Sequence, residues 1–224
     1  MFAQWKIARL ERFILRRTRP AMVRAYGEEF HQELYRRSKS VARAILPQVP
    51  DIGNSVFKTN YYYCVCYCGW FGAMQAMGLS ADEAVKVIWF INEAYLKSFP
   101  RGLMKLGGRF YAHTRRKRGP KAAARSLSGN VHPMDWKIRY EQVDSTTWKI
   151  DILECFMVKL AQKLGIKDML PGICRMDYPF SHYFDTEFRR KGTLADGFPW
   201  CDCWYRYPGR CDWPVAMDIE GNRE

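Results

Sequence analysis

Hydrophobic residues in the first half of the chain recur three or four positions apart, the spacing of one buried face of an α-helix. The clearest stripe precedes the prolines at positions 47 and 50 and consists of Phe30, Leu34, Val41 and Ile45. We therefore predict a helix that ends near Leu46, because proline cannot continue a helix. For the same reason, Arg19-Pro20 is predicted to break an earlier, basic helix.

Two more helices are predicted before residue 100. The segment 57–77 is aromatic, cysteine-rich and apolar, which indicates a central core helix stopped by Gly78. Ser80 and Glu83 form a capping-box pattern, which starts a helix that ends near Pro100.

Glycine and proline pairs interrupt the basic segment that follows. They are Gly107-Gly108 and Gly119-Pro120. Because both residue types disfavour a helix interior, residues 101–125 are predicted to be helical in pieces, with loops at the joints.

The pattern changes after Pro133 to alternation of apolar and polar residues, which is the period of a half-buried β-strand. The apolar positions are Trp136, Ile138 and Tyr140, and then Trp148, Ile150 and Ile152. Asp144-Ser145 lies between the two runs and supplies a turn, so a hairpin is predicted.

Helical spacing returns over 154–164 and closes at Gly165, and a further helix is predicted over 177–190. Strands are predicted over 193–195 and 200–207, meeting at a turn at Gly197. Together these elements predict an α+β fold, an N-terminal helical layer packed on a small, mostly antiparallel C-terminal sheet.

At 224 residues the chain is long enough for one full core, and we expect a single domain over 1–224. Within it we expect a mainly helical lobe over 1–130, an α+β lobe over 131–210 that carries the site, and a tail over 211–224.

Composition favours a globular protein, since 48% of residues are hydrophobic and 15% are aromatic. No apolar run approaches the ~20 residues that span a bilayer, and residues 1–20 lack the apolar core of a secretory signal. We therefore expect a cytoplasmic protein without a transmembrane segment. The eight cysteines are interpreted as reduced thiols, because disulfide frameworks are typical of much smaller secreted chains.

The formal net charge of +13 is concentrated in two segments. Residues 1–50 contain eleven Lys or Arg and four Glu, and residues 101–125 contain nine Lys or Arg and no acidic residue. Such a field favours anionic partners, whether nucleic acid, acidic lipid or a small carboxylate. No nucleic-acid reader module surrounds the run Arg115 to Arg118, so we expect an anionic small-molecule substrate rather than nucleic acid. Oligomer formation is left open.

The candidate chemistry lies in the last third of the chain. Two glycines, Thr193 and Asp196 fall within 192–197, followed by Cys201-Asp202-Cys203 and preceded by Cys174, Asp177 and His182. On a strand, Cys201 and Cys203 point to one side and Asp202 to the other. A convergent thiol could act as nucleophile or proton donor, and the alternative for each thiol is structural burial.

His182 has two acidic neighbours in sequence, Asp177 and Asp185. On a helix, His182 and Asp185 would be adjacent, and a carboxylate can orient an imidazole as a general base. The alternative is a surface pair that stabilises the helix slightly.

A metal site is the less favoured interpretation of the cysteines. Cys64, Cys66 and Cys68 lack zinc spacing and sit among aromatic residues, which favours core packing. Cys155, Cys174 and Cys201 could converge with His182 on a zinc ion, but no pair has C-x-x-C spacing. We predict no metal and no cofactor. The competing hypothesis is a non-hydrolytic binding or redox protein that holds a flat cofactor or a metal in a Cys/aromatic pocket.

Over about 49–207 the chain resembles the L-2-amino-thiazoline-4-carboxylic acid hydrolase family. The likeness is strongest over 152–177, which includes Cys155, Cys174 and Asp177, and it continues through 190–197 to Cys201-Asp202. The usual Cys-Asp-Phe-Arg ending appears here as Cys201-Asp202-Cys203-Trp204-Tyr205-Arg206, a departure that alters the wall of the site.

The resemblance implies a hydrolase that opens a cyclic amidine ring with C–S cleavage. It implies that Asp177 or Asp202 pairs with the amidine, that His182 or a carboxylate acts as base, and that Cys174 or Cys201 is a possible nucleophile. Backbone amides near Gly192 would stabilise the tetrahedral state. The remaining substrate-binding candidates are Cys155, Thr193, Gly197, Arg175, Arg190 and Arg206.

Overall fold

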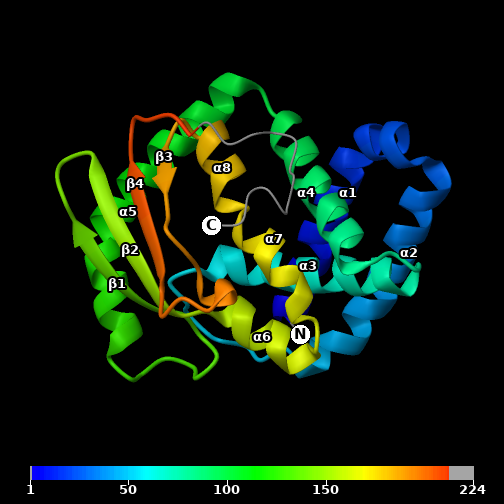
Figure 1. The fold of residues 1–224 in the computed structure, drawn as a ribbon, viewed down its shortest axis with the longest axis horizontal. Helices are drawn as coiled ribbons and strands as arrows, with labels where there is room; N and C mark the ends of the chain where they lie inside the picture. The colour runs from blue at the N-terminus through cyan, green and yellow to red at the C-terminus, as the bar shows by residue number, and fades with distance from the viewer. Residues whose placement is uncertain (1, 212–224) are drawn as a thin grey trace.

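The computed structural model describes residues 2–211, so most of the expected tail over 211–224 lies outside the described residues. Four N-terminal helices pack against one another (Figure 1). They are α1 (Phe2–Tyr26), α2 (Glu28–Ile45), α3 (Lys58–Ala76) and α4 (Ala81–Lys97), with a short 3-10 turn, η1 (Leu46–Gln48), after α2.

The first helix continues through Pro20, contrary to the predicted break. Ile14 and Leu15 before the proline and Met22 after it are all fully buried, so a continuous apolar face holds the helix together on both sides. The chain turns instead at Gly27, whose φ of 89° is readily adopted only by glycine.

The central core helix and the capping box are confirmed. Most of α3 is buried, including all three cysteines of its C-x-C-x-C run. At the start of α4, the Ser80 hydroxyl accepts a hydrogen bond from the Glu83 amide, and the Glu83 carboxylate accepts one from the Ser80 amide.

Helix α5 (Arg101–Leu127) is continuous, and the prediction of separate helical pieces is wrong. Its glycines allow close packing instead of breaking the helix. A β-carbon on Gly108 would lie 2.7 Å from the carbonyl carbon of Phe184, and one on Gly119 would overlap the Tyr140 ring. The lack of a side chain at these two positions therefore allows the helix to pack closely against Phe184 and Tyr140.

The sheet is antiparallel throughout, with strand order β1-β2-β4-β3. Its strands are β1 (Lys137–Gln142), β2 (Thr147–Glu154), β3 (Glu187–Arg189) and β4 (Cys201–Arg206). The predicted β1–β2 hairpin is confirmed, and in its turn the Asp144 carboxylate accepts hydrogen bonds from the amides of Thr146 and Thr147.

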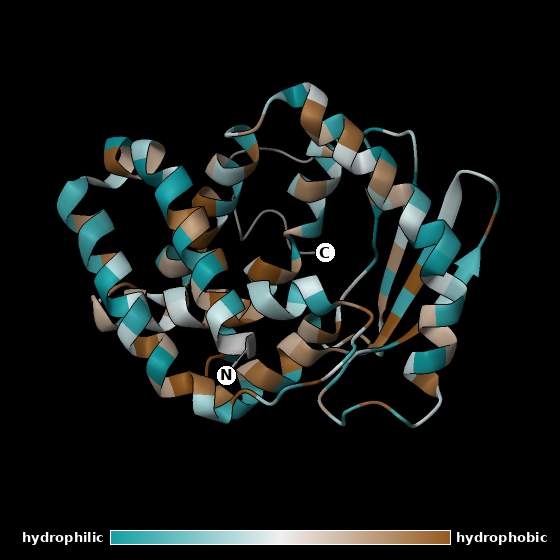
Figure 2. Cartoon of the chain, turned by 180° about the vertical axis from the view of Figure 1, so that it is seen from behind, coloured by the Kyte–Doolittle hydropathy of each residue, from teal (hydrophilic) through white to brown (hydrophobic). Residues whose placement is uncertain are grey.

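One face of the sheet is apolar and the other is charged, as the alternation predicts. The buried face includes Ile138, Trp148, Ile150, Cys203 and Tyr205. Helix α5 lies against this face at β1, and Figure 2 views the molecule from that side. The opposite face carries cross-strand ion pairs such as Arg139–Asp151 and Lys149–Glu141.

Short elements fill the space between the sheet and helices α1–α4 (Figure 1). They are α6 (Phe156–Leu164), η2 (Lys167–Met169), α7 (Leu170–Cys174), α8 (Asp177–Tyr183) and η3 (Leu194–Asp196). The predicted stop of α6 at Gly165 is confirmed, since this residue has the left-handed conformation.

Two predictions in this region are wrong. The helix expected over 177–190 ends at Tyr183, because Asp185 has a φ of 50° and the chain then enters β3. The strand expected over 193–195 is a 3-10 turn, in which the Thr193 hydroxyl caps the Asp196 amide. The strand that pairs with β4 at this edge of the sheet is β3, and not the segment over 193–195.

The fold is α+β, as predicted, with helices preceding a small antiparallel sheet. None of the described helices is long and apolar enough to span a membrane.

Candidate functional site

The centre of the candidate site is a buried arginine paired with a carboxylate. Arg190, which follows β3, has a side chain only 2% exposed. Its Nη1 donates to Oδ2 of Asp177, at the start of α8, over 3.1 Å. Its Nη2 donates to the carbonyl oxygen of Cys174, at the end of α7, over 3.0 Å. One guanidinium thus ties together the sheet and two short helices.

Aromatic rings complete the surroundings of this cation. The Arg190 guanidinium carbon lies 5.3 Å from the centroid of Phe188 and 5.7 Å from that of Tyr178, both within cation–π range. The Asp177 side chain, by contrast, is 41% exposed. The pair therefore presents a carboxylate toward solvent, with its cation held behind it.

Three thiols lie within electrostatic reach of Arg190. Burial raises the pKa of Cys201 to about 12, and the Leu194 amide and the Arg190 charge oppose that rise. The Leu194 amide is 3.3 Å from Cys201 Sγ. Burial also raises the pKa of Cys174 and of Cys203, and the Arg190 charge again opposes the rise. All three thiols are therefore neutral at physiological pH, and the Arg190 charge offsets only part of the effect of burial.

Cys155 is the residue that precedes α6, and its thiol belongs to the same cluster. Burial raises its pKa, whereas the amides of Val158 and Met157 and the Trp136 indole act in the opposite direction. The Asp177 carboxylate contributes a smaller rise in its pKa. Repulsion from Cys155 adds to the rise in the pKa of Cys174, so the two thiols are within electrostatic reach of each other.

The structure adds to the candidate site three residues that the sequence did not indicate. Tyr205, on the same face of β4 as Cys203, and Tyr111 of α5 have pKa values raised by burial and, to a smaller extent, by Asp177. Arg115, one turn after Tyr111, lies with its guanidinium carbon 5.0 Å from the centroid of that ring. The i, i+4 spacing of Tyr111 and Arg115 was the only available signal, and Arg115 stands within the basic run Arg115 to Arg118.

Other predicted residues shape the neighbouring loop. Asp202 Oδ1 accepts hydrogen bonds from the amides of Lys191 and Gly192, at 2.9 and 3.1 Å. The Thr193 hydroxyl donates to the Asp196 carboxylate, and Gly197 ends η3 with a φ of 86°. These contacts fix the course of the chain between Arg190 and Cys201.

The predicted imidazole–carboxylate pair is not formed. His182 Nδ1 lies 2.8 Å from the carbonyl oxygen of Cys211, and its ring N–H can donate to it. Asp185 binds Arg101 and Lys105 of α5 instead, at 2.9 and 3.1 Å. The left-handed backbone at Asp185 ends the helix that would have aligned the two side chains.

The other predicted arginines lie outside the thiol cluster. Arg206 forms an ion pair with Glu187 on the charged face of the sheet, opposite to the face that holds Cys201 and Cys203. Arg175 is buried and donates to the carbonyl of Pro171. Of the predicted residues, the structure thus groups Cys155, Cys174, Asp177, Arg190 and Cys201.

The C-x-C-x-C run is packed in the core, as the favoured interpretation held. Cys64, Cys66 and Cys68 are all buried. Within residues 2–211, no three His, Cys, Asp or Glu side chains are arranged to hold a metal ion.

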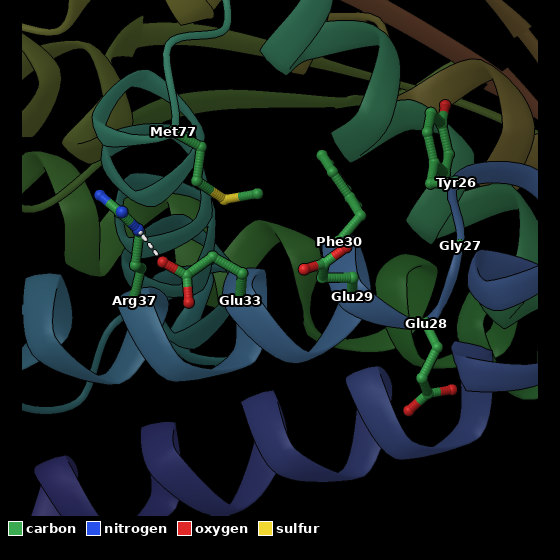
Figure 3. A pocket seen from close by; sticks show the side chains of 8 residues that line it. All are labelled: Tyr26, Gly27, Glu28, Glu29, Phe30, Glu33, Arg37 and Met77. Atoms are coloured by element: carbon green, nitrogen blue, oxygen red, sulfur yellow. Dashed lines mark hydrogen bonds and ion pairs between the residues drawn. The ribbon is translucent and has the colours of Figure 1, made fainter.

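An open surface hollow of about 580 Å³ lies elsewhere, at the junction of α1 and α2 (Figure 3). Its carboxylates include Glu33, which is paired with Arg37. The lining consists of Tyr26, Gly27, Glu28, Glu29, Phe30, Glu33, Arg37 and Met77. None of the predicted site residues is among them, so this hollow is separate from the thiol cluster.

Residues 83–205 match the family model described as L-2-amino-thiazoline-4-carboxylic acid hydrolase. The matched span is more than half of the chain and contains Tyr111, Cys155, Asp177, Arg190 and Cys201. No curated protein matches the chain.

Proposed function

The chain belongs to the L-2-amino-thiazoline-4-carboxylic acid hydrolase family, and we propose that it hydrolyses a small cyclic amidine with C–S cleavage. The substrate would be a 2-amino-thiazoline-4-carboxylate or a close analogue. The supporting observation is the buried Arg190, which pairs with Asp177 and whose charge acts on three thiols inside the matched span.

Asp177 is the proposed site for the amidine. A carboxylate accepts two parallel N–H bonds, and an amidine offers one N–H from its ring nitrogen and one from its exocyclic nitrogen. The partial exposure of Asp177 lets a substrate reach it. Arg190 acts as a positioning residue, because its bond to Oδ2 sets the direction of the carboxylate.

Cys201 is the proposed nucleophile. Its thiol accepts a hydrogen bond from the Leu194 amide and lies within the field of Arg190, and both stabilise a thiolate. Cys174 is the less favoured nucleophile, because the hydrogen bond from Nη2 of the Arg190 side chain goes to its main-chain carbonyl oxygen. Because the resting thiol is neutral, its proton must leave as the carbon–sulfur bond forms, and Asp177 is the proposed acceptor.

The proposed reaction has two stages, ring opening and release of the product from Cys201. Cys201 Sγ attacks the amidine carbon, its proton passes to Asp177, and the bond from that carbon to the ring sulfur breaks. The ring sulfur takes the proton and becomes a thiol, while the carbon remains bound to Cys201. Water then adds to this carbon, Cys201 leaves and is reprotonated, and an N-carbamoyl product with a free thiol is released. One water molecule is consumed.

Arg115 is proposed to hold the carboxylate of the substrate. It is half-buried and stacks on Tyr111, and the pKa of Tyr111 also responds to the charges of Asp177 and Cys203. A zwitterionic substrate would then have its amidine at Asp177 and its carboxylate at Arg115. Bidentate recognition by a guanidinium suits this geometry.

The experiment is a ring-opening assay that follows thiol release from 2-amino-thiazoline-4-carboxylate and related cyclic amidines. We expect Cys201→Ala to lower kcat/KM by about 1,000-fold or more, and Asp177→Asn by about 100-fold. Cys68→Ala, a buried thiol in α3, is the matched control and should retain activity.

Intermediate trapping separates the proposed route from direct attack by water. After acid quench, mass spectrometry should detect a covalent adduct on Cys201 in the active enzyme. Full activity of a folded Cys201→Ala variant would refute the nucleophile assignment. A folded wild-type protein that opens none of these rings would refute the proposed activity itself.

A further inference from the structure

The outward side of helix α5 carries three large apolar side chains in water. Leu103 is 54% exposed, Leu106 is 62% exposed and Phe110 is 72% exposed. Their spacing of i, i+3 and i+7 places them on one line along the helix. A folded chain gains nothing from such exposure, so this line is a candidate contact surface.

The line lies directly opposite the packed side of the helix. The buried positions of α5 include Met104, Gly108 and Ala112, which recur every four residues. At 3.6 residues per turn, Leu106 and Phe110 are about half a turn away from Gly108. No rearrangement of the fold is needed to expose them.

Basic residues continue the same line toward the C-terminal half of the helix. Lys117 and Lys121 follow Phe110 at further steps of seven and four residues, and both are exposed. We use the name α5 outer face for Leu103, Leu106, Phe110, Lys117 and Lys121. It combines an apolar half with a cationic half.

The rest of the helix adds positive charge that is only partly compensated. Residues 101–125 contain nine basic residues and no acidic one. Arg101 and Lys105 share one acidic partner, Asp185. Within the part of the chain that the structure describes, Arg109, Lys117, Arg118 and Lys121 have no acidic partner and are exposed.

We propose that the α5 outer face binds the surface of an anionic phospholipid membrane. The helix would lie parallel to the surface, with Leu103, Leu106 and Phe110 at the boundary between headgroups and acyl chains. Lys117 and Lys121 would meet the anionic headgroups. An apolar line combined with a basic face and no acidic residue is the pattern of interfacial helices.

Two other occupants fit the surface less well. A nucleic acid would bind the lysines but leave the three apolar side chains facing a charged phosphate backbone. A second copy of the chain would bring the same cationic faces together, and like charges repel. A lipid surface satisfies both halves of the α5 outer face at once.

The test uses flotation of the full chain with vesicles of phosphatidylcholine, alone or with phosphatidylserine. We expect binding to the phosphatidylserine vesicles at least ten-fold tighter than to the neutral ones. Leu106→Ser/Phe110→Ser should weaken binding to the anionic vesicles by at least ten-fold. Lys117→Gln/Lys121→Gln should weaken it by roughly five-fold per lysine at low salt.

Matched controls change similar side chains elsewhere. Val143→Ser removes an exposed apolar residue from the hairpin, and Lys86→Gln/Lys167→Gln removes two exposed charges from other helices. These variants should bind like wild type. Circular dichroism confirms that each protein is folded, and all of these substitutions lie outside the proposed hydrolytic site.

Three outcomes would overturn the proposal. The first is wild-type protein that does not float with phosphatidylserine vesicles. The second is binding that the Leu106/Phe110 variant leaves unchanged. The third is an RNA duplex that binds more tightly than the vesicles and is insensitive to that variant, which would show that charge alone governs this face.

Discussion

Gly119 of α5 lies directly against the ring of Tyr140 in β1. A β-carbon at position 119 would come within 2.5 Å of Cδ2 of that ring, closer than real side-chain contacts allow. This contact sets the distance between α5 and the sheet. It also aligns the helix that supplies Tyr111 and Arg115 on one side and the α5 outer face on the other.

Gly119→Ala should therefore destabilise the fold, although alanine favours helices more than glycine does. We expect a loss of about 1–3 kcal/mol in the free energy of unfolding, because the ring or the helix must shift. Gly102→Ala in the same helix has nothing within 4 Å of the new β-carbon and should be neutral or stabilising. Urea denaturation of both variants checks this, and equal effects would show that the contact is unimportant.

Asp135 links the loop before α3 to the sheet. Its side chain is buried, and Oδ1 accepts hydrogen bonds from the Ser55 hydroxyl and from the Trp136 amide, at 2.5 and 2.7 Å. Asp135→Ala leaves both donors without this acceptor, so we expect a loss of about 2–3 kcal/mol and a fall in Tm of roughly 5–10 °C. Asp168→Ala, at an exposed position, should change Tm by less than about 2 °C in the same calorimetric measurement.

Arg190→Lys tests the geometry of the site. A lysine cannot donate from two nitrogens to both Asp177 and the Cys174 carbonyl. We expect kcat/KM for ring opening to fall by about 10- to 100-fold. The neighbouring Arg189→Lys is the control, because Arg189 is exposed on the charged face of the sheet. Comparable losses in the two variants would argue against a positioning role for Arg190.

The buried thiols predict a loss of stability at alkaline pH. Burial raises the pKa of Cys68 and of Cys201 to about 12, against 9.0 for an unperturbed thiol. Between these values the unfolded thiol loses its proton while the folded one keeps it, so stability is complete below pH 9 and falls as pH rises. Each thiol contributes a slope of roughly 1 kcal/mol per pH unit.

Urea denaturation from pH 8 to 10.5, under reducing conditions, measures this slope. Cys68→Ala removes one of the buried thiols whose pKa is raised and should give a shallower decline than wild type. Identical slopes in the two proteins would mean that Cys68 ionises as readily in the folded state as in the unfolded one.

Local sequence pattern was enough to predict the elements whose signals lie within a few residues of one another. The Ser80–Glu83 capping box, the stop at Gly165 and the alternation around the Asp144 turn each involve neighbours in sequence, and each is confirmed. The fold class follows from these elements. The resemblance to the hydrolase family likewise rested on short motifs, and the matched span confirms it.

Tertiary packing decided the secondary structure at positions where local preference and burial conflict. Pro20 and the glycines of α5 remain inside helices, because apolar contacts on both sides outweigh the local cost. The grouping of Arg190, Asp177 and the thiols was also beyond local pattern, since these side chains come from separate elements. Their proximity depends on how α7, α8 and the sheet pack, and sequence spacing carries no information about distances across a core.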